Sequence, residues 1–209
     1  MGTAGKLERA PGVRAMKPRQ IREAASRLFL ANGYGAVSMD AIAREAGVSK
    51  ATIYAHFADK AELFAALVTE ECARQWPDIG LLEAEPGDLR ETLLALGTVY
   101  AELLVSPKVV QTYRMVVAEA PRFPELGRAF YEGGPGLICG KLAAYLARAA
   151  AQGKLTLGDA RLAAQQFLAL LRCEYHLRAV IDLAPAPTPA EIARVAAAAT
   201  DMFLRAYGR

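Results

Sequence analysis

Residues 40–60 of this chain read DAIAREAGVSKATIYAHFADK, and they predict two short helices joined by a tight turn. Ser38 lies where its side chain caps the first helix, and Ser49 lies where it caps the second. Between them, Gly47 suits the left-handed position that ends a helix, and Val48 supplies the apolar contact of the turn. This arrangement is that of a helix-turn-helix unit.

The second helix has two chemically different faces. Ile53 and Phe57 are four residues apart, so they anchor one face to a core. The opposite face presents small and polar residues, namely Lys50, Ala51, Thr52, Tyr54 and His56. Taken singly, each of these residues also suits an ordinary surface hairpin. Their ordered pattern favours a surface on which something anionic docks.

DNA is the partner that this surface fits. The major groove admits one helix, whose N-terminal residues come closest to the base edges. Ala51 and Thr52 are small enough to permit that approach, and Lys50 is able to donate to guanine acceptors. Donors farther along the chain suit phosphates, which set register rather than sequence; these donors are Tyr54, His56 and Lys60.

The basic charge is concentrated in the same part of the chain. Residues 1–60 hold 10 Lys/Arg and 5 Asp/Glu, a net +5, whereas the remainder carries a net −2. A basic excess beside the helix-turn-helix is the expected electrostatic footprint on phosphate. Part of it lies in residues 1–17, which we expect to form a flexible basic tail that either reaches an adjacent groove or contributes nothing.

Composition narrows the class of protein. Hydrophobic residues make up 54% of the 209 residues, too many for a disordered chain. No apolar run reaches the ~18 residues of a membrane span, and no signal-peptide core is evident. Cys72, Cys139 and Cys173 are odd in number and far apart, which argues against a disulfide framework. We therefore expect a cytoplasmic protein with no membrane partner.

The rest of the chain shows helical periodicity and almost no strand pattern, so we predict an all-α fold. Outside the helix-turn-helix, the first expected helix starts at Pro18 and ends near Gly33. The later ones cover residues 59–75, 88–106, 109–118, 126–151, 157–183 and 189–207, and the helix over 126–151 has a break near 133–136. The last two carry apolar residues on more than one side. Such helices must be buried, either in a monomeric core or against a partner.

The stretches RQIREAASRLFLANGYGAVSM (residues 19–39) and DAIAREAGVSKATIYAHFADKAELF (residues 40–64) resemble the TetR (tetracycline-repressor-like) family of transcriptional regulators. The similar region runs from Arg19 to about Leu67, and the family usually has a bulky residue where this chain has Ala55. The resemblance implies base-reading positions at Lys50, Ala51 and Thr52, and phosphate contacts at Ser38, Tyr54, His56 and Lys60. With the cap Ser49, these residues form the DNA-binding surface that we predict.

The resemblance also implies the domain organisation. Residues 18–64 would form a three-helix helix-turn-helix DNA-binding domain, and residues 65–209 a larger α-helical effector-binding and dimerisation domain. Family members pair their last two helices with those of a second subunit, so a homodimer on double-stranded, roughly palindromic operator DNA is expected.

Residues 106–136, SPKVVQTYRMVVAEAPRFPELGRAFYEGGPG, resemble the C-terminal domain of an AefR-like subgroup. The middle helices would then enclose a pocket for a small-molecule effector. Its candidate lining residues are either ligand contacts or plain core: Tyr100, Tyr113, Met115, Val117, Phe130, Phe167, Leu171 and Tyr175. Four charged residues either orient a ligand or pair with one another: Arg114, Glu119, Arg172 and Glu174.

Signals for catalysis are sparse. His56 and His176 are the two histidines, and Cys173 with His176 could share a helix face as part of a metal or thiolate site. A buried structural cysteine is the commoner case. No phosphate-binding loop or serine nucleophile motif is present, so we expect no cofactor and no enzyme. The prediction is a ligand-responsive repressor; the alternative is a helical small-molecule-binding or enzymatic protein with an inert helix-turn-helix.

Overall fold

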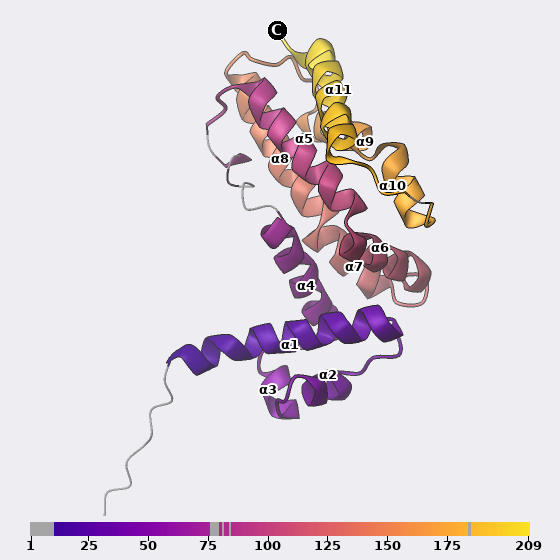
Figure 1. The fold of residues 1–209 in the computed structure, drawn as a ribbon. Coiled ribbons are helices and arrows are strands. Elements are labelled where there is room, and N and C mark those ends of the chain that lie inside the picture. Colours follow the sequence, from indigo (N-terminus) through magenta and orange to yellow (C-terminus); the bar gives the residue numbers. More distant parts are fainter. Residues whose placement is uncertain (1–10, 76–79, 81, 84, 184) are drawn as a thin grey trace, which may run out of the picture.

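The computed structural model describes residues 11–75, 80, 82–83, 85–183 and 185–209, and side chains from residue 17 to residue 71 and again within the later ranges. These residues form eleven α-helices and one isolated β-bridge, between Leu155 and Gly208. The fold is all-α, as predicted. The N-terminal helices form the lower unit in Figure 1, and α4 leads from it to the larger bundle above.

The N-terminal unit contains α1 (Pro11–Asn32), α2 (Met39–Glu45), α3 (Lys50–Tyr54) and the start of α4 (Lys60–Gln75). In Figure 1, α1 lies across the base of α4, with α2 and α3 below it. Their apolar faces meet in one core that includes Ile21, Phe29, Ile42, Ile53 and Phe64. This is the three-helix arrangement expected of a helix-turn-helix domain.

Helix α1 is longer than predicted. It begins at Pro11, so Pro18, the predicted first residue, lies inside it. A proline removes one backbone hydrogen bond and crowds the preceding turn. Ala15, Met16 and Lys17 are strong helix formers, which favours helix on the N-terminal side of the proline. Of the predicted tail, residues 1–10 lie outside the described residues.

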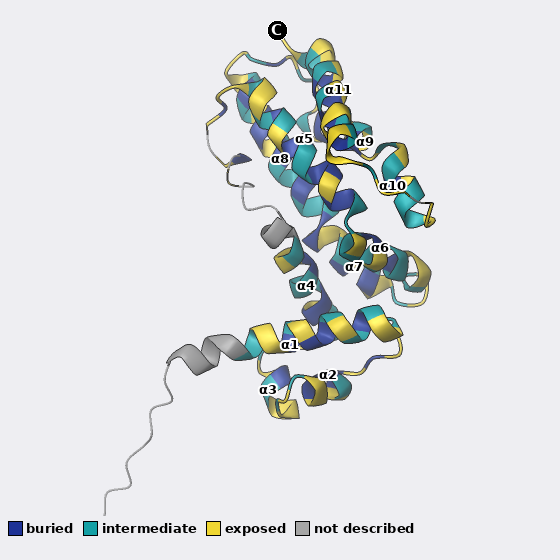
Figure 2. Ribbon diagram, in the orientation of Figure 1, coloured by how far each residue is buried: buried dark blue, intermediate teal, exposed yellow. Residues whose placement is uncertain are grey.

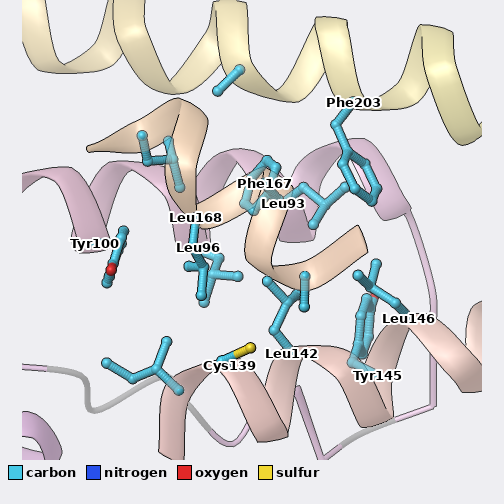
Figure 3. Packing of buried hydrophobic residues seen from close by; sticks show 14 of the residues in the cluster. Leu93, Leu96, Tyr100, Cys139, Leu142, Tyr145, Leu146, Phe167, Leu168 and Phe203 are labelled. Atoms are coloured by element: carbon cyan, nitrogen blue, oxygen red, sulfur yellow. The ribbon is translucent and has the colours of Figure 1, made fainter. Parts of the chain in front are cut away.

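The larger bundle is built on α5 (Leu89–Val105), α8 (Pro135–Ala151), α9 (Ala160–Leu171) and α11 (Pro189–Tyr207). Figure 2 shows buried positions gathered where these helices meet. Figure 3 shows the packing, with Phe203 of α11 beside Phe167 of α9 at a ring-centroid distance of 5.3 Å. Both rings are almost fully buried.

Proline sets two helix starts that the sequence prediction placed too late. Helix α6 runs over Pro107–Glu119 and α7 over Pro124–Gly133. Proline suits the first helical turn, where its missing N–H has no partner to lose. In the part of the chain that the structure describes, no single helix is long and apolar enough to cross a membrane, although α5 and α6 reach that length together across a 63° bend.

The predicted helix over residues 157–183 is two helices. Helix α9 ends at Leu171 and α10 covers Cys173–Val180, with Arg172 in a turn between them. The N–H of Arg172 lies 3.2 Å from the carbonyl oxygens of both Leu168 and Ala169, so one donor is shared at this point. Apolar periodicity continues across the break, which is why the sequence did not reveal it.

The core of the N-terminal unit extends into the C-terminal part. Val116 of α6 and Leu126 and Ala129 of α7 are buried in the same cluster as the residues of α1–α4. The predicted boundary between residues 64 and 65 falls inside α4. The two parts therefore share apolar packing at their junction.

Candidate nucleic-acid interface and ligand cavity

The helix-turn-helix is held by local hydrogen bonds. The Ser38 side chain accepts from the N–H of Ala41 at 3.1 Å and caps α2. At the other end of α2, the N–H of Val48 donates to the carbonyl of Ala43 at 3.0 Å, and Gly47 has φ +64°. This is the left-handed helix end that the sequence predicted, and glycine adopts it without a steric cost.

Helix α3 presents one face to the core and one to solvent. The Ser49 side chain accepts from the N–H of Thr52 at 3.1 Å, and the two hydroxyls lie 2.8 Å apart. Ile53 and Phe57 are buried, as predicted. On the other side, Lys50, Ala51 and Tyr54 are exposed, whereas Thr52 and His56 are half-buried.

The Lys50 ammonium has a partner on α2. It donates to the carboxylate of Asp40 at 3.0 Å, and it lies 6.0 Å from the ring centroid of Tyr54. The hydrogen bond to Asp40 raises the pKa of Lys50. Because both side chains are more than half exposed, their pairing is worth little in water and is readily exchanged for another anion.

Lys60 differs from the other predicted phosphate contacts because its ammonium is bound inside the protein. Its ammonium donates to the carbonyls of Tyr34 at 2.8 Å and Val37 at 2.9 Å, and it sits 4.1 Å from the Tyr34 ring centroid. Burial lowers the pKa of Lys60. Two of its three N–H donors are used inside the protein, so this geometry favours a structural tie over a phosphate contact.

Glu119 joins the end of α6 to the turn between α1 and α2. Its carboxylate accepts from the N–H of Tyr34 at 2.6 Å and from the N–H of Gly35. Phe123 packs edge-on against Tyr34 with ring centroids 5.5 Å apart. At Gly33, where φ is +81°, a Cβ atom would lie 2.5 Å from the Glu119 carboxylate, so the turn needs glycine there.

A cavity lies where the N-terminal unit meets the bundle. It contains about 920 Å³ of space between atoms, part of it open to solvent. Its lining is mostly apolar and aromatic, with a few polar groups: Ser26, Phe29, Leu30, Phe64, Leu67, Val68, Glu71, Tyr100, Leu103, Leu104, Lys108, Val109, Thr112, Tyr113, Met115, Phe130, Pro135, Ile138, Arg172 and His176. This composition is typical of small-molecule sites.

The predicted pocket residues divide into two groups. Tyr100, Tyr113, Met115 and Phe130 line the cavity. The other four do not: Phe167 and Leu171 belong to the bundle core, Tyr175 lines separate hollows outside the cavity, and Val117 is 58% exposed. Val117 follows Val116, which is buried, and the next position on a helix points about 100° away.

The sequence prediction missed the part of the cavity wall that α1 and α4 contribute. Ser26, Phe29 and Leu30 follow an i, i+3, i+4 spacing on α1, and Phe64, Leu67 and Val68 repeat it on α4. That spacing marks an apolar helix face. Part of each face also packs in the core of the helix-turn-helix unit, where Phe29, Phe64 and Val68 are buried. The signal was present, but periodicity does not distinguish a face that packs from one that lines a cavity.

The charged residues left open by the sequence take separate roles. Arg114 donates to the carbonyls of Ala179 and Val180 at 2.7 and 2.6 Å, which ties α6 to the end of α10. Glu174 lies 3.5 Å from Arg178 on its own helix. Arg172 faces the cavity instead.

His176 is also part of the cavity wall. Its Nδ1 lies 2.9 Å from the carbonyl oxygen of Leu104, so Nδ1 carries the proton and Nε2 is left as an acceptor. Burial is the main cause of the lowered pKa of His176, and the charge of Arg172 acts in the same direction. Cys173 is half-buried nearby. Among the described residues, no three His, Cys, Asp or Glu side chains come together as a metal site requires.

Two family patterns match this chain. Residues 21–67 match bacterial regulatory proteins of the tetR family, and residues 91–209 match the C-terminal domain of AefR-like transcriptional repressors. Among solved structures, the flavonoid-responsive regulator FrrA is 38% identical over 93% of this chain and 98% of its own, with a TM-score of 0.77. A TetR-family regulator from Mesorhizobium loti MAFF303099, described as putative, is 32% identical over 94% and 98%, with a TM-score of 0.78.

A curated relative is the HTH-type transcriptional regulator YvkB of Bacillus subtilis (strain 168), which is uncharacterized. It is 36% identical over 91 residues, or 43% of this chain. The chain matches about half of that relative's length, 47%.

Proposed function

The chain belongs to the tetR family of bacterial regulatory proteins, with an AefR-like C-terminal domain, and from this premise we propose that it represses transcription as a ligand-responsive dimer. Regulators of this family bind operator DNA and act as dimers with effector-binding domains. For this chain, the proposal is that a small molecule in the cavity releases the protein from a palindromic operator.

The position of the cavity carries the proposal. Helices α1 and α4 contribute Phe29 and Phe64 both to the cavity wall and to the core that supports α2 and α3. A ligand that changes the positions of these two side chains therefore acts on the unit that would hold the DNA. The coupling is reciprocal, so operator DNA weakens ligand binding by the factor by which the ligand weakens operator binding.

The DNA-binding surface is the exposed side of α3. We assign base contacts to Lys50, Ala51 and Thr52, and phosphate contacts to Ser38, Ser49, Tyr54 and His56. Lys60 is assigned a supporting role, because its ammonium is bound to the carbonyls of Tyr34 and Val37.

Dimerisation is supported by apolar exposure near the C-terminus. Five of the eight large hydrophobic side chains that are exposed among the described residues come from residues 160–207, and these are Leu162, Leu177, Ile181, Leu183 and Met202. Leu177 and Ile181 are four residues apart at the end of α10, so their side chains share one face of the chain there. Pairing of α9, α10 and α11 with a second copy would cover it and set two α3 helices on successive major grooves.

The test is genomic footprinting with the purified full-length protein, followed by salt titration at the recovered site. We expect Tyr54→Ala to weaken operator binding at every salt concentration with little change in the slope of log K against log [salt], because a neutral phenol that contacts a phosphate releases no counterion. Tyr131→Ala is the matched control, because Tyr131 is 51% exposed on α7 and Tyr54 is 46% exposed on α3.

Two results decide between this proposal and an inert helix-turn-helix. No sequence-specific fragment in the footprint would exclude a DNA-binding regulator and favour a helical small-molecule-binding or enzymatic protein. A specific site from which no small molecule releases the protein would leave DNA binding in place and remove the ligand response.

A further inference from the structure

Arg172 is the charged residue of the cavity wall whose charge the protein leaves without a counterion. It stands at the break between α9 and α10 and lines the cavity. Over the ranges that the structure describes, no side chain or carbonyl accepts a hydrogen bond from its guanidinium. A guanidinium carries five N–H donors in a planar fork that matches a carboxylate.

The other charges of the wall cancel. Lys108 donates to the carboxylate of Glu71 at 2.6 Å, so one positive and one negative group neutralise each other. His176 has a lowered pKa and donates through Nδ1 to a backbone carbonyl, so it contributes no charge near neutral pH. The described wall therefore carries a net positive charge, and Arg172 is its source.

Arg172 also stands at the entrance of the cavity. Tyr113, Arg172 and His176 line both the cavity and an outer hollow, which Leu177 and Val180 of α10 help to form. Arg172 itself is exposed, so a group bound there keeps part of its hydration. Towards α1 and α4 the wall is mostly apolar and includes Phe29 and Phe64, while its polar groups there include Ser26 and the Lys108–Glu71 ion pair.

We propose that the cavity takes an elongated amphiphile with one anionic head group, and that Arg172 pairs with this head group at the entrance. The apolar body of the ligand extends inward towards α1 and α4. The inference rests on the proposed function, because it names the chemical class of ligand for the same cavity.

The geometry favours this orientation over the reverse. A carboxylate placed among apolar side chains such as Phe29 and Phe64 would lose its hydration without gaining a partner, which is costly. At Arg172 it gains charge-assisted hydrogen bonds while remaining partly in water. Helix α6 contacts both α10 and α1 and lies between them in Figure 1, so an inward-pointing chain runs along α6 towards the DNA-binding unit.

The experiment compares three probes with the same alkyl chain: decanoate, decan-1-ol and decyltrimethylammonium. Binding of each to the full-length protein is measured by isothermal titration calorimetry. We expect decanoate to bind most tightly and decyltrimethylammonium most weakly. Arg172→Gln should weaken decanoate binding roughly tenfold and leave decan-1-ol binding nearly unchanged.

Two further variants make the result specific. Arg172→Lys keeps the positive charge and should retain most of the preference for decanoate. Arg178→Gln removes one arginine from α10 at a residue that does not line the cavity, and it should bind all three probes as the wild type does.

The proposal is overturned if decanoate binds no better than decan-1-ol, if decanoate does not bind, or if Arg172→Gln keeps the preference for decanoate. Binding of decan-1-ol alone would show a ligand cavity without the anionic preference, so it would refute this inference and leave the proposed function standing. Loss of sequence-specific operator binding is a separate result and would count against the proposed function.

Discussion

Removing the Glu119 carboxylate should loosen the junction between α6 and the helix-turn-helix unit. Glu119 is the last residue of α6, and it accepts hydrogen bonds from the N–H groups of Tyr34 and Gly35. Glu119→Ala removes both acceptors. Glu119→Gln keeps the length of the side chain and one acceptor oxygen but removes the charge.

The size of the effect follows from the burial of the two donors. A hydrogen bond to a charged group contributes about 1.5–3 kcal/mol. Tyr34 is buried, so its N–H has little access to water once the carboxylate is gone, whereas the N–H of exposed Gly35 is readily hydrated. We therefore expect Glu119→Ala to lower the free energy of unfolding by about 2 kcal/mol and Glu119→Gln by about 1 kcal/mol.

The assay is urea unfolding followed by circular dichroism, at one protein concentration for all variants because a dimer's stability depends on it. A loss of about 2 kcal/mol corresponds to a drop in Tm on the order of 4–8 °C for a chain of this size. Glu132→Ala is the matched control, since Glu132 is an exposed glutamate on α7.

Equal unfolding free energies for Glu119→Ala and Glu132→Ala would refute the role assigned to the carboxylate. A larger loss in Glu119→Gln than in Glu119→Ala would also contradict the reasoning, because the amide retains an acceptor that alanine lacks.

Three further predictions test other contacts. Gly47→Ala and Gly153→Ala should each lower the free energy of unfolding by about 1 kcal/mol, because both glycines have φ near +70° and an added Cβ meets no other atom. In a gel-shift titration, operator binding should weaken for Gly47→Ala and stay unchanged for Gly153→Ala. Asp40→Asn should tighten operator binding roughly two- to fivefold in the same titration, because it releases Lys50 and removes a negative charge from the DNA-binding surface. Burial is the main cause that raises the pKa of Tyr34 from 10.0 to about 12, so between these pH values the folded protein keeps the phenol protonated and the unfolded chain ionises it. The free energy of unfolding should therefore fall by roughly 2 kcal/mol between pH 10 and 12. Unfolding of Tyr34→Phe, measured over the same pH range, should lack this fall.

The helix-turn-helix was readable from sequence because its determinants are local. Ser38, Gly47 and Ser49 each act on backbone groups within a few residues, and the structure has all three in the expected conformations. Ile53 and Phe57 are buried for the reason that their four-residue spacing implied. The all-α fold follows from the same kind of local periodicity.

Contacts between distant residues were not readable. The ammonium of Lys60 meets carbonyls 26 and 23 residues away, and Glu119 meets amides 85 and 84 residues away. Nothing in the neighbouring sequence marks these partners. The cavity wall is hidden for a similar reason, because Val117 and Met115 are both apolar residues of one helix and only the packing of the other helices decides which faces the cavity.

The apolar packing shared by α1–α4 with Val116, Leu126 and Ala129 bears on the engineering of hybrid regulators. A chimera that exchanges only α1–α3 and the start of α4 would place the side chains of another protein against α6 and α7. The buried residues of α6 and α7 would then lose the surface against which they pack. The natural unit of exchange is therefore discontinuous in sequence. To transplant this specificity, a recipient would have to receive the contact faces of α6 and α7 together with the N-terminal helices.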